Sequence, residues 1–457
     1  MSTDRQLKAP SPGDSDRFAR DRFWNLIVLG LVRGGENMAL VIAAFLIFQS
    51  THSVVLVGMV LFCFNMPQPF LAKPAIALSN RWGPPLICAV VVSVEGLCTL
   101  VLAGIALTTQ LSVPMLLAWV AAIGICEGLK QGNPFLIAEI LAPEGRLPEF
   151  NSARTRSIAI GSIAGMLLSG ILFHSGGAAW VYFLAGLCYF PDVLVYGAIH
   201  RKSPHVRPDS AEQETLRVAW RYFRSDPGIW VAAQCTAAVF FIASFVVLLP
   251  AIASQIGSSA EILSVLEVGT IVGGILVTLV VGRLHGRVGW SRVHMFFAVL
   301  AGLILTFMSA TEFFGGSHSR IAGVMVAIAA VPLGFAILMN STVLTSMVQL
   351  ATPDEHRVSF YTILSLIPVL VIVVGQEAVG YLADQFSIAT AFGIMAVAVL
   401  AFNVIASHSS MNDHLAALDD SDTPLAVNHA LLIRGIHRHH GLHLRRPSST
   451  SGPEPGP

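Results

Sequence analysis

Two pairs of opposite charges lie inside otherwise apolar stretches of this sequence. Arg33 and Glu36 are three residues apart, and Glu127 and Lys130 repeat this spacing in another stretch. On a helix, residues three apart lie on one face and can form an ion pair. A charged side chain at the centre of a bilayer costs about 2.5–3.5 kcal/mol or more, so such residues are candidates for proton transfer or substrate binding. A purely structural ion pair is the alternative for both.

Other polar residues accompany these pairs. Asn37 follows the first pair and Gln131 follows the second, and polar side chains also interrupt later apolar segments at Asn65, Glu267, Asn340, Gln376 and Glu377. We expect the proton-coupling or substrate-binding residues to come from this whole set. Glu36 is the first choice for a carboxyl group that exchanges a proton.

The composition is that of a membrane protein. Hydrophobic residues make up 54% of the 457 residues and charged residues only 12%, whereas a typical soluble domain is about 25% charged. This excludes a soluble multidomain protein and predicts a polytopic membrane protein.

Twelve apolar segments are near or above the ~20 residues that a helix needs to cross a bilayer. β-Barrel strands would be about half as long, so helices are predicted. The segments are residues 23–47, 53–78, 85–107, 113–139, 153–173, 178–199, 229–254, 260–283, 293–313, 320–348, 358–383 and 387–407.

The Lys and Arg residues predict an orientation. With the N-terminus in the cytoplasm, nearly all of the 27 basic residues are cytoplasmic; Arg33, Lys73 and Lys130 lie within spans, and Arg320 is external. This bias follows the positive-inside rule, so both termini are predicted to be cytoplasmic. The first 22 residues are polar, unlike a cleavable signal sequence.

The spans predict five regions. They are a cytoplasmic N-terminal segment (1–22), an N-terminal six-helix bundle (23–199), a cytoplasmic linker (200–228), a C-terminal six-helix bundle (229–407) and a partly disordered cytoplasmic tail (408–457). In the linker, Arg217, Arg221 and Arg224 share one helical face, which predicts an amphipathic helix on the membrane surface. Four histidines between 437 and 443 could bind a transition metal, but they lack the spacing of a closed zinc site, so a basic, lipid-facing or disordered tail is favoured.

One loop occurs twice. Leu78-Ser-Asn-Arg-Trp-Gly83 and Leu284-His-Gly-Arg-Val-Gly289 share Leu, Arg and Gly at matching offsets, and each follows an apolar segment. Ala142-Pro-Glu144 and Thr352-Pro-Asp354 form a second such pair. Two homologous bundles in tandem are typical of secondary transporters.

With these loops in place, the chain resembles the major facilitator superfamily over residues 20–407. The loop with Leu78, Arg81 and Gly83 is similar to that family's Gly-x-Leu-x-Asp-Arg-x-Gly-Arg signature. The segments ETLRVAWRYFRSDPGIW, VVLLPAIASQIG and VQLATPDEHRVSFYTIL resemble the branch that includes the enterobactin exporter and macrolide efflux proteins. The resemblance implies an all-α fold of twelve transmembrane helices in two pseudo-symmetric six-helix bundles.

The resemblance also implies that the repeated loop closes a cytoplasmic gate. The expected gate residues are Asn80, Arg81, Gly83, Arg287 and Gly289. Asn80 stands where the signature has Asp, so Arg81 needs another partner, for which Glu139 or a helix C-terminus is a candidate. The run Gly161-x-x-x-Gly165 with Gly170 is similar to the family's antiporter glycine motif without its Pro.

In this family, spans 1, 2, 4, 5, 7, 8, 10 and 11 line the central cavity. The resemblance therefore favours Glu36, Glu127, Glu267 and Glu377 over Glu95 and Asp192, which lie in the outer spans. The prolines within residues 65–69 predict a kink in the second span. The glycines at 269, 273 and 274 predict close helix packing.

The favoured hypothesis is a secondary active transporter that performs proton-coupled efflux of a small amphipathic organic molecule, such as a drug, siderophore or secondary metabolite, by alternating access. Uptake or uniport of an organic solute, and a non-transporting receptor on the same fold, are the alternatives. The sequence lacks an HExxH motif, a phosphate-binding P-loop and a Gly-x-Ser-x-Gly elbow, so enzymatic activity is not expected.

No cofactor or metal is expected, because all six cysteines lie in apolar segments without CxxC spacing. The predicted partners are a small-molecule substrate, protons and the lipid bilayer, with no nucleic acid, and the protein is expected to be a monomer. The resemblance implies a bacterial plasma membrane as its location.

Overall fold

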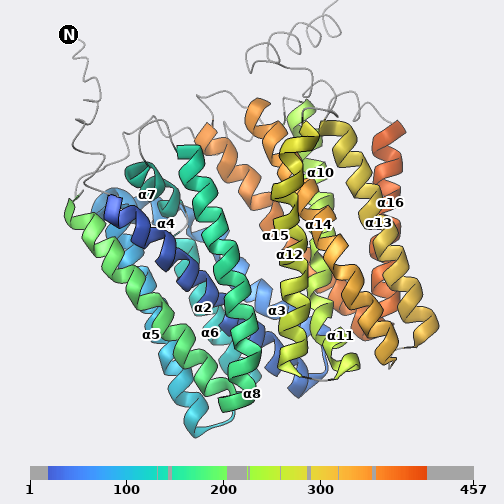
Figure 1. Ribbon diagram of the computed structural model, residues 1–457, viewed down its shortest axis with the longest axis horizontal. Helices are drawn as coiled ribbons and strands as arrows, with labels where there is room; N and C mark the ends of the chain where they lie inside the picture. Colours follow the sequence, from blue (N-terminus) through green and yellow to red (C-terminus); the bar gives the residue numbers. More distant parts are fainter. Residues whose placement is uncertain are drawn as a thin grey trace, which may run out of the picture.

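The computed structural model describes residues 19–130, 132–142, 147–202, 224, 227–257, 259–285, 290–316, 319–351 and 357–408. Every regular element among these residues is a helix (Figure 1). The elements are α2 (Ala19–Thr51), α3 (Val54–Asn65), α4 (Pro67–Trp82), α5 (Pro84–Thr108), α6 (Val113–Lys130), α7 (Asn133–Leu141), α8 (Leu147–Lys202), α10 (Pro227–Ala243), η1 (Ser244–Leu248), α11 (Leu249–Ile256), α12 (Ala260–His285), α13 (Trp290–Gly315), α14 (Arg320–Ala351), α15 (Arg357–Gln385) and α16 (Ile388–His408).

These helices match the predicted spans in order. Three spans consist of consecutive elements: α3 with α4, α6 with α7, and α10 with η1 and α11. The fifth and sixth spans together form α8, which breaks at Gly177, where φ is 71° and ψ is −170°, a conformation that glycine adopts without strain. Nine stretches of the described residues, one of them Ala153–Lys202 across this break, are long and apolar enough to cross a membrane. The predicted all-α membrane fold is confirmed.

The helices form two groups that lie side by side in Figure 1. The N half comprises α2–α8, in which α8 packs against both α2 and α5. The C half comprises α10–α16, in which α14 packs against α12 and α13, and α16 packs against α13. The predicted linker helix and the histidine-rich tail fall outside the described residues, so the proposed region boundaries stay predictions.

Glycines bring helix backbones into contact inside each half. A Cβ atom on Gly165 would collide with the backbone of Gly34, so α8 and α2 can approach this closely only without side chains at these positions. In the C half, Gly273 faces the carbonyl oxygen of Val331 across α12 and α14 in the same way. The predicted packing role of the glycine run in the eighth span is thereby confirmed.

Two spans of the N half break near their middle. Pro67 lacks a backbone N–H, and the second span divides there into α3 and α4, which confirms the predicted kink. The fourth span divides between α6 and α7, and Gly132 lies in this connection with φ of 85°. Because α6 ends at Lys130, the break directly follows one of the charged candidates.

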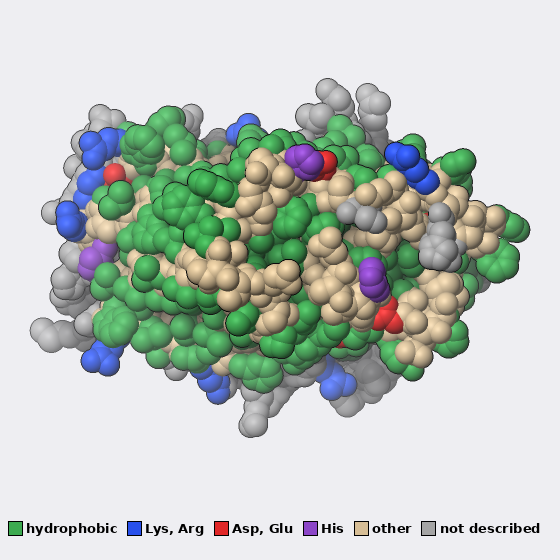
Figure 2. Space-filling view, turned by 90° about the horizontal axis from the view of Figure 1, so that it is seen from below, with side chains coloured by type: hydrophobic (Ala, Val, Ile, Leu, Met, Phe, Trp, Pro, Cys, Tyr) green, Lys and Arg blue, Asp and Glu red, His purple; other side chains and the backbone are tan. Residues whose placement is uncertain are grey.

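The two halves touch at the end of the molecule where α2 leads into α3 and α15 leads into α16, the lower end in Figure 1. We call it the gate end. The predicted orientation places it outside the cell, at the opposite end from the loop with Arg81 and Gly83 that is expected to form the cytoplasmic gate. Here the hydroxyl oxygens of Ser169 on α8 and Ser264 on α12 lie 3.0 Å apart, and α3 packs against α15. Figure 2 views this end and shows a face with mostly hydrophobic and uncharged side chains.

Candidate functional site

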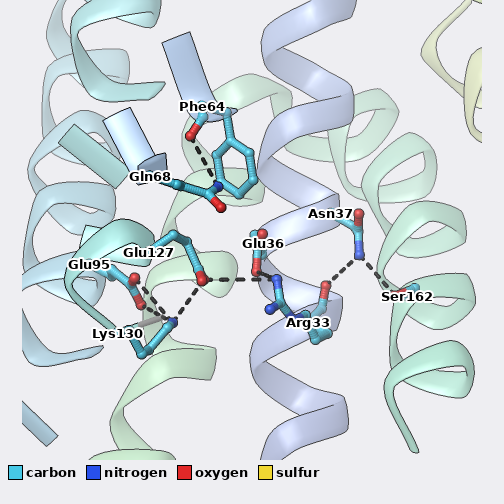
Figure 3. Close-up of polar contacts among 9 residues, drawn as sticks. All are labelled: Arg33, Glu36, Asn37, Phe64, Gln68, Glu95, Glu127, Lys130 and Ser162. Carbon is cyan, nitrogen blue, oxygen red and sulfur yellow. Dashed lines mark hydrogen bonds and ion pairs between the residues drawn. The ribbon is translucent and has the colours of Figure 1, made fainter. Parts of the chain in front are cut away.

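Five charged side chains from three helices form a continuous chain of ion pairs (Figure 3). Arg33 on α2 contacts Glu36 at 2.6 Å and Glu127 on α6 at 3.8 Å. Lys130 contacts Glu127 at 2.8 Å and Glu95 on α5 at 3.0 Å. Acid and base therefore alternate from Glu36 to Glu95. We call these five residues the charge chain.

The charge chain lies deep in the N half. Arg33 and Glu36 lie near the middle of α2, and Glu95 lies near the middle of α5. Glu127 and Lys130 lie where α6 ends, which is the middle of the fourth span because α7 continues it. Helices rise 1.5 Å per residue, so all three spans present their charges at a similar depth. This is the depth at which secondary transporters place substrate and coupling-ion sites.

Arg33 is the most exposed member of the charge chain, and exposure falls from it toward Glu95. The side chain of Arg33 is 34% exposed, while Glu127, Lys130 and Glu36 are between 5% and 12% exposed and Glu95 is fully buried. Water or a solute therefore reaches the chain at Arg33. Glu95 is accessible only through movement of its neighbours.

The charge balance of this cluster is uneven. Three carboxylates face two cations, so the charge chain carries one surplus negative charge when all five groups are ionised. Buried charges are costly unless they are paired, and Lys130 and Arg33 are each shared between two carboxylates. One additional positive charge, either a proton or a cationic group, would make the cluster neutral.

Neighbouring residues hold the charge chain in place. The amide of Asn37 donates to the backbone oxygen of Arg33 at 2.9 Å and to Ser162 Oγ on α8 at 2.9 Å. Gly128, between the two charges of α6, lies against Gln68 of α4, where a Cβ atom would be 3.0 Å from the Gln68 Cα. Gln68 itself donates to the carbonyl oxygen of Phe64 at 3.3 Å, an oxygen close to the kink in the second span. The site is thus built on the first five of the predicted spans.

The structure brings together some of the predicted candidates. Arg33, Glu36, Glu127 and Lys130 are joined, with Asn37 beside them, whereas Gln131 lies outside the described residues. Glu95 was ranked below the cavity acids, yet the structure makes it the buried end of the charge chain. Glu95 lies near the middle of its span, as Lys130 does in the fourth span. This shared depth is the sequence signal that would have indicated an ion pair between Glu95 and Lys130. Asp192, the other acid ranked low, is also buried in the N half, and among the described residues it makes no ion pair with the charge chain.

The candidates of the second span and the C half lie apart from the charge chain. Asn65 donates to the backbone oxygen of Leu61 at 2.9 Å within its own helix. Asn340 is fully buried between α14 and α13, where its side-chain oxygen lies 2.9 Å from His294 Nδ1. Its role as a proton-coupling or substrate-binding residue stays a prediction.

Three other candidates of the C half are Glu267, Gln376 and Glu377. Each has at least one side-chain oxygen that makes no hydrogen bond within the described residues. Glu377 on α15 lies against Gly58 of α3, and one of its oxygens is buried without a hydrogen bond. Gln376 likewise has a buried, unpaired side-chain oxygen. Within the described residues, no hydrogen bond or ion pair involves the Glu267 carboxyl group. These three remain proposals as functional residues.

The expected cytoplasmic gate is described in part. Gly83 has φ of 86° and connects α4 to α5, as a glycine in a tight turn does. Arg81 is exposed, and its guanidinium carbon lies 5.9 Å from the centre of the Trp82 ring. The side chains of Asn80 and Glu139 lie outside the described set, as do Arg287 and Gly289, so the gate role stays a prediction.

Comparison with known families and proteins places this geometry in context. The family model described as Major Facilitator Superfamily matches residues 26–376. A Staphylococcus aureus protein named staphyloferrin A transporter is 21% identical over 264 residues, which cover 57% of this chain and 66% of that protein. The enterobactin exporter EntS of Citrobacter koseri is 26% identical over 58% of this chain and 62% of its own length. The matches to these two relatives span less than two thirds of their length.

A longer match links the chain to the enterobactin exporter EntS of Salmonella typhimurium, at 25% identity over 73% of this chain and 77% of that protein. Among solved structures, a bacterial homologue of the iron transporter ferroportin superposes with a TM-score of 0.67 at 13% identity, covering 88% of this chain and 99% of that one. A bacterial homologue of the lysosomal transporter Spinster gives 0.61 at 15% identity, covering 89% and 100%. These two likenesses support the fold.

Proposed function

Since the chain belongs to the Major Facilitator Superfamily, we propose that this multi-pass membrane transporter couples proton movement to the efflux of a small amphipathic organic molecule by alternating access. The observation that carries the proposal is the surplus negative charge of the charge chain. Because one positive charge neutralises the cluster, a single proton and a cationic group of the substrate can compete for it. Such competition is the basis of antiport.

Glu36 is the best candidate for the group that exchanges the proton. It is itself buried, but it lies beside Arg33, the most exposed residue of the charge chain, and is paired with that one cation only, at 2.6 Å. Both carboxylate oxygens of Glu95 accept hydrogen bonds from Lys130 Nζ, at 3.1 and 3.0 Å, and Glu95 is fully buried. Glu127 is shared between both cations. A proton therefore displaces the fewest contacts at Glu36.

The direction and substrate class rest on the relatives and the sequence. Two of the relatives are named as exporters, which supports efflux of a drug, siderophore or secondary metabolite. The bacterial relatives support a bacterial plasma membrane as the location, and the positive-inside bias supports both termini in the cytoplasm. Uptake or uniport remains the alternative function, since Asn80 and Gly286 replace the acidic positions of both gate loops.

The test is proton movement in liposomes that contain the pure protein and an internal pH dye. With an imposed proton gradient, amphipathic compounds of differing charge are added, and gradient collapse is recorded for the wild type and Glu36→Gln. We expect one or more compounds to trigger collapse with the wild type but not with the variant. Glu312→Gln is the matched control, because Glu312 is a buried glutamate on α13 that pairs with Gln255 away from the charge chain.

If Glu36→Gln moves protons at the wild-type rate, the assignment of Glu36 is wrong. If compounds cross the membrane with no proton movement in any variant, uniport replaces proton coupling. Net accumulation of a solute by intact cells would instead establish uptake.

A further inference from the structure

A carboxylate of the C half caps the N-terminus of a helix of the N half at the gate end. Asp384, one residue before the end of α15, accepts hydrogen bonds from Ser53 Oγ at 2.6 Å, Val54 N at 2.8 Å and Val55 N at 3.1 Å. These donors are the N-cap and the first two residues of α3. The residues joined are about 330 positions apart in sequence.

The first backbone N–H groups of a helix have no partner inside the helix and carry partial positive charge. In most helices the residue just before the helix supplies the acceptor. Ser53 does so here only for Leu56 N, at 3.3 Å. Asp384 supplies the acceptors for Val54 and Val55, so the cap of α3 is complete only while the two halves touch at this end.

The local backbone directs the N-terminus of α3 toward α15. α2 ends at Thr51, and His52 has φ of 53°, a left-handed conformation that few non-glycine residues adopt. The chain therefore reverses within two residues and presents Ser53 to the other half. On α15, Gly380 lies one turn before Asp384, and a Cβ atom there would be 3.1 Å from Val55 Cα. This close approach lets the carboxylate reach the helix end.

The halves also meet at this end through a second pair of helices, α8 and α12. Gly170 of α8 lies against the backbone of Glu261 on α12, and His174 Nδ1 lies 3.5 Å from a carboxylate oxygen of Glu261. Both of these side chains are largely exposed, so their pairing contributes little. Opening at this end must break the three hydrogen bonds to Asp384 as well as the contact between Ser169 and Ser264.

We propose that Asp384 is the latch of the gate end: its carboxylate caps α3 only in the closed state and thereby sets how often this end opens. The inference concerns the conformational equilibrium of the transporter and does not depend on proton coupling. Opening separates α3 from α15 and leaves the N-terminal N–H groups of α3 to water.

The experiment measures the equilibrium directly in the full-length protein in nanodiscs, without substrate or a proton gradient. Spin labels are introduced as unnatural amino acids at Gln110 and Phe314, which are exposed and lie at the gate end on opposite halves. The native cysteines then remain in place. Double electron–electron resonance gives the populations of short and long distances between the labels.

We expect Asp384→Ala to raise the ratio of long to short distances about tenfold, as loss of a charged helix cap implies. Asp384→Asn should raise it by a smaller factor of about two to five, because the amide oxygen still accepts a hydrogen bond but carries no charge. Gln385→Ala is the matched control, since Gln385 is the exposed neighbour at the end of α15, and it should leave the distribution unchanged.

A wild-type distance distribution for folded Asp384→Ala would overturn the proposal, and so would an equal shift for Gln385→Ala. If Asp384→Ala does not fold, Asp384→Asn decides: an increase in the long-distance population supports the latch, and no change overturns it.

Discussion

Replacing Lys130 by methionine removes the cation that two buried carboxylates share. Lys130 Nζ lies 3.0 and 3.1 Å from the two oxygens of Glu95 and 2.8 Å from Glu127. After the substitution, Glu127 keeps its longer contact of 3.8 Å with Arg33. Glu95 keeps no cation among these contacts. The variant therefore contains an uncompensated carboxylate in a fully buried position.

The size of the effect follows from this geometry. Removing one partner of a buried ion pair costs about 3–5 kcal/mol, because the remaining charge stays buried. Adding Glu95→Gln removes that charge and restores the surplus of one, with Glu36 and Glu127 facing Arg33. We therefore expect the double variant to be more stable than Lys130→Met alone by about 1–3 kcal/mol, the usual penalty for a buried polar group that has lost its partner.

The assay is the free energy of unfolding in mixed micelles for the wild type, both single variants and the double variant. Lys73→Met is the matched control, because Lys73 is exposed on α4 and its loss should change stability by less than about 0.5 kcal/mol. The reasoning is refuted if Glu95→Gln lowers the stability of Lys130→Met further. It is also refuted if Lys130→Met is as stable as the wild type.

Two more predictions concern stability. Gly165→Ala places a methyl group against the backbone of Gly34, so α2 and α8 must separate, and we expect a loss of monodisperse protein on size exclusion. The control Gly197→Ala should purify normally, because a Cβ atom there meets no other atom within 4 Å. Glu377→Gln removes a carboxyl group that has a buried oxygen and no described partner. Since burying an unpaired charge is unfavourable, the thermal melting temperature of this variant should equal or exceed that of the wild type. A marked decrease would show that Glu377 has a stabilising partner.

Much of the fold could be predicted from the sequence, because a bilayer imposes strong rules. Hydropathy located each span to within a few residues of the observed helices, since a spanning helix must satisfy its own backbone hydrogen bonds. The kink at Pro67 and the turn at Gly83 were also predictable, because both depend on the backbone chemistry of single residues. Such features are local and need no knowledge of neighbouring helices.

The site was predictable only where its contacts are local. The spacing of Arg33 with Glu36 and of Glu127 with Lys130 indicated two ion pairs, and both pairs form. The link between the pairs, and the contact of Lys130 with Glu95, depend on how α2, α5 and α6 rotate about their axes. Spacing within one helix carries no information about that rotation.

The latch and the charge chain are connected by a single short helix. At one end, the first N–H groups of α3 rest on Asp384. At the other, the carbonyl oxygens of Cys63 and Phe64 lie against Gly124 of α6, where no side chain would fit. Gly124 is three residues before Glu127, on the same face of that helix. Since α3 is a short helix of 12 residues, we expect it to move as one unit, so that its release from α15 displaces the surface against which the charged end of α6 is packed. Opening of the gate end and rearrangement of the charge chain are therefore expected to occur together, because α3 cannot move at one end alone.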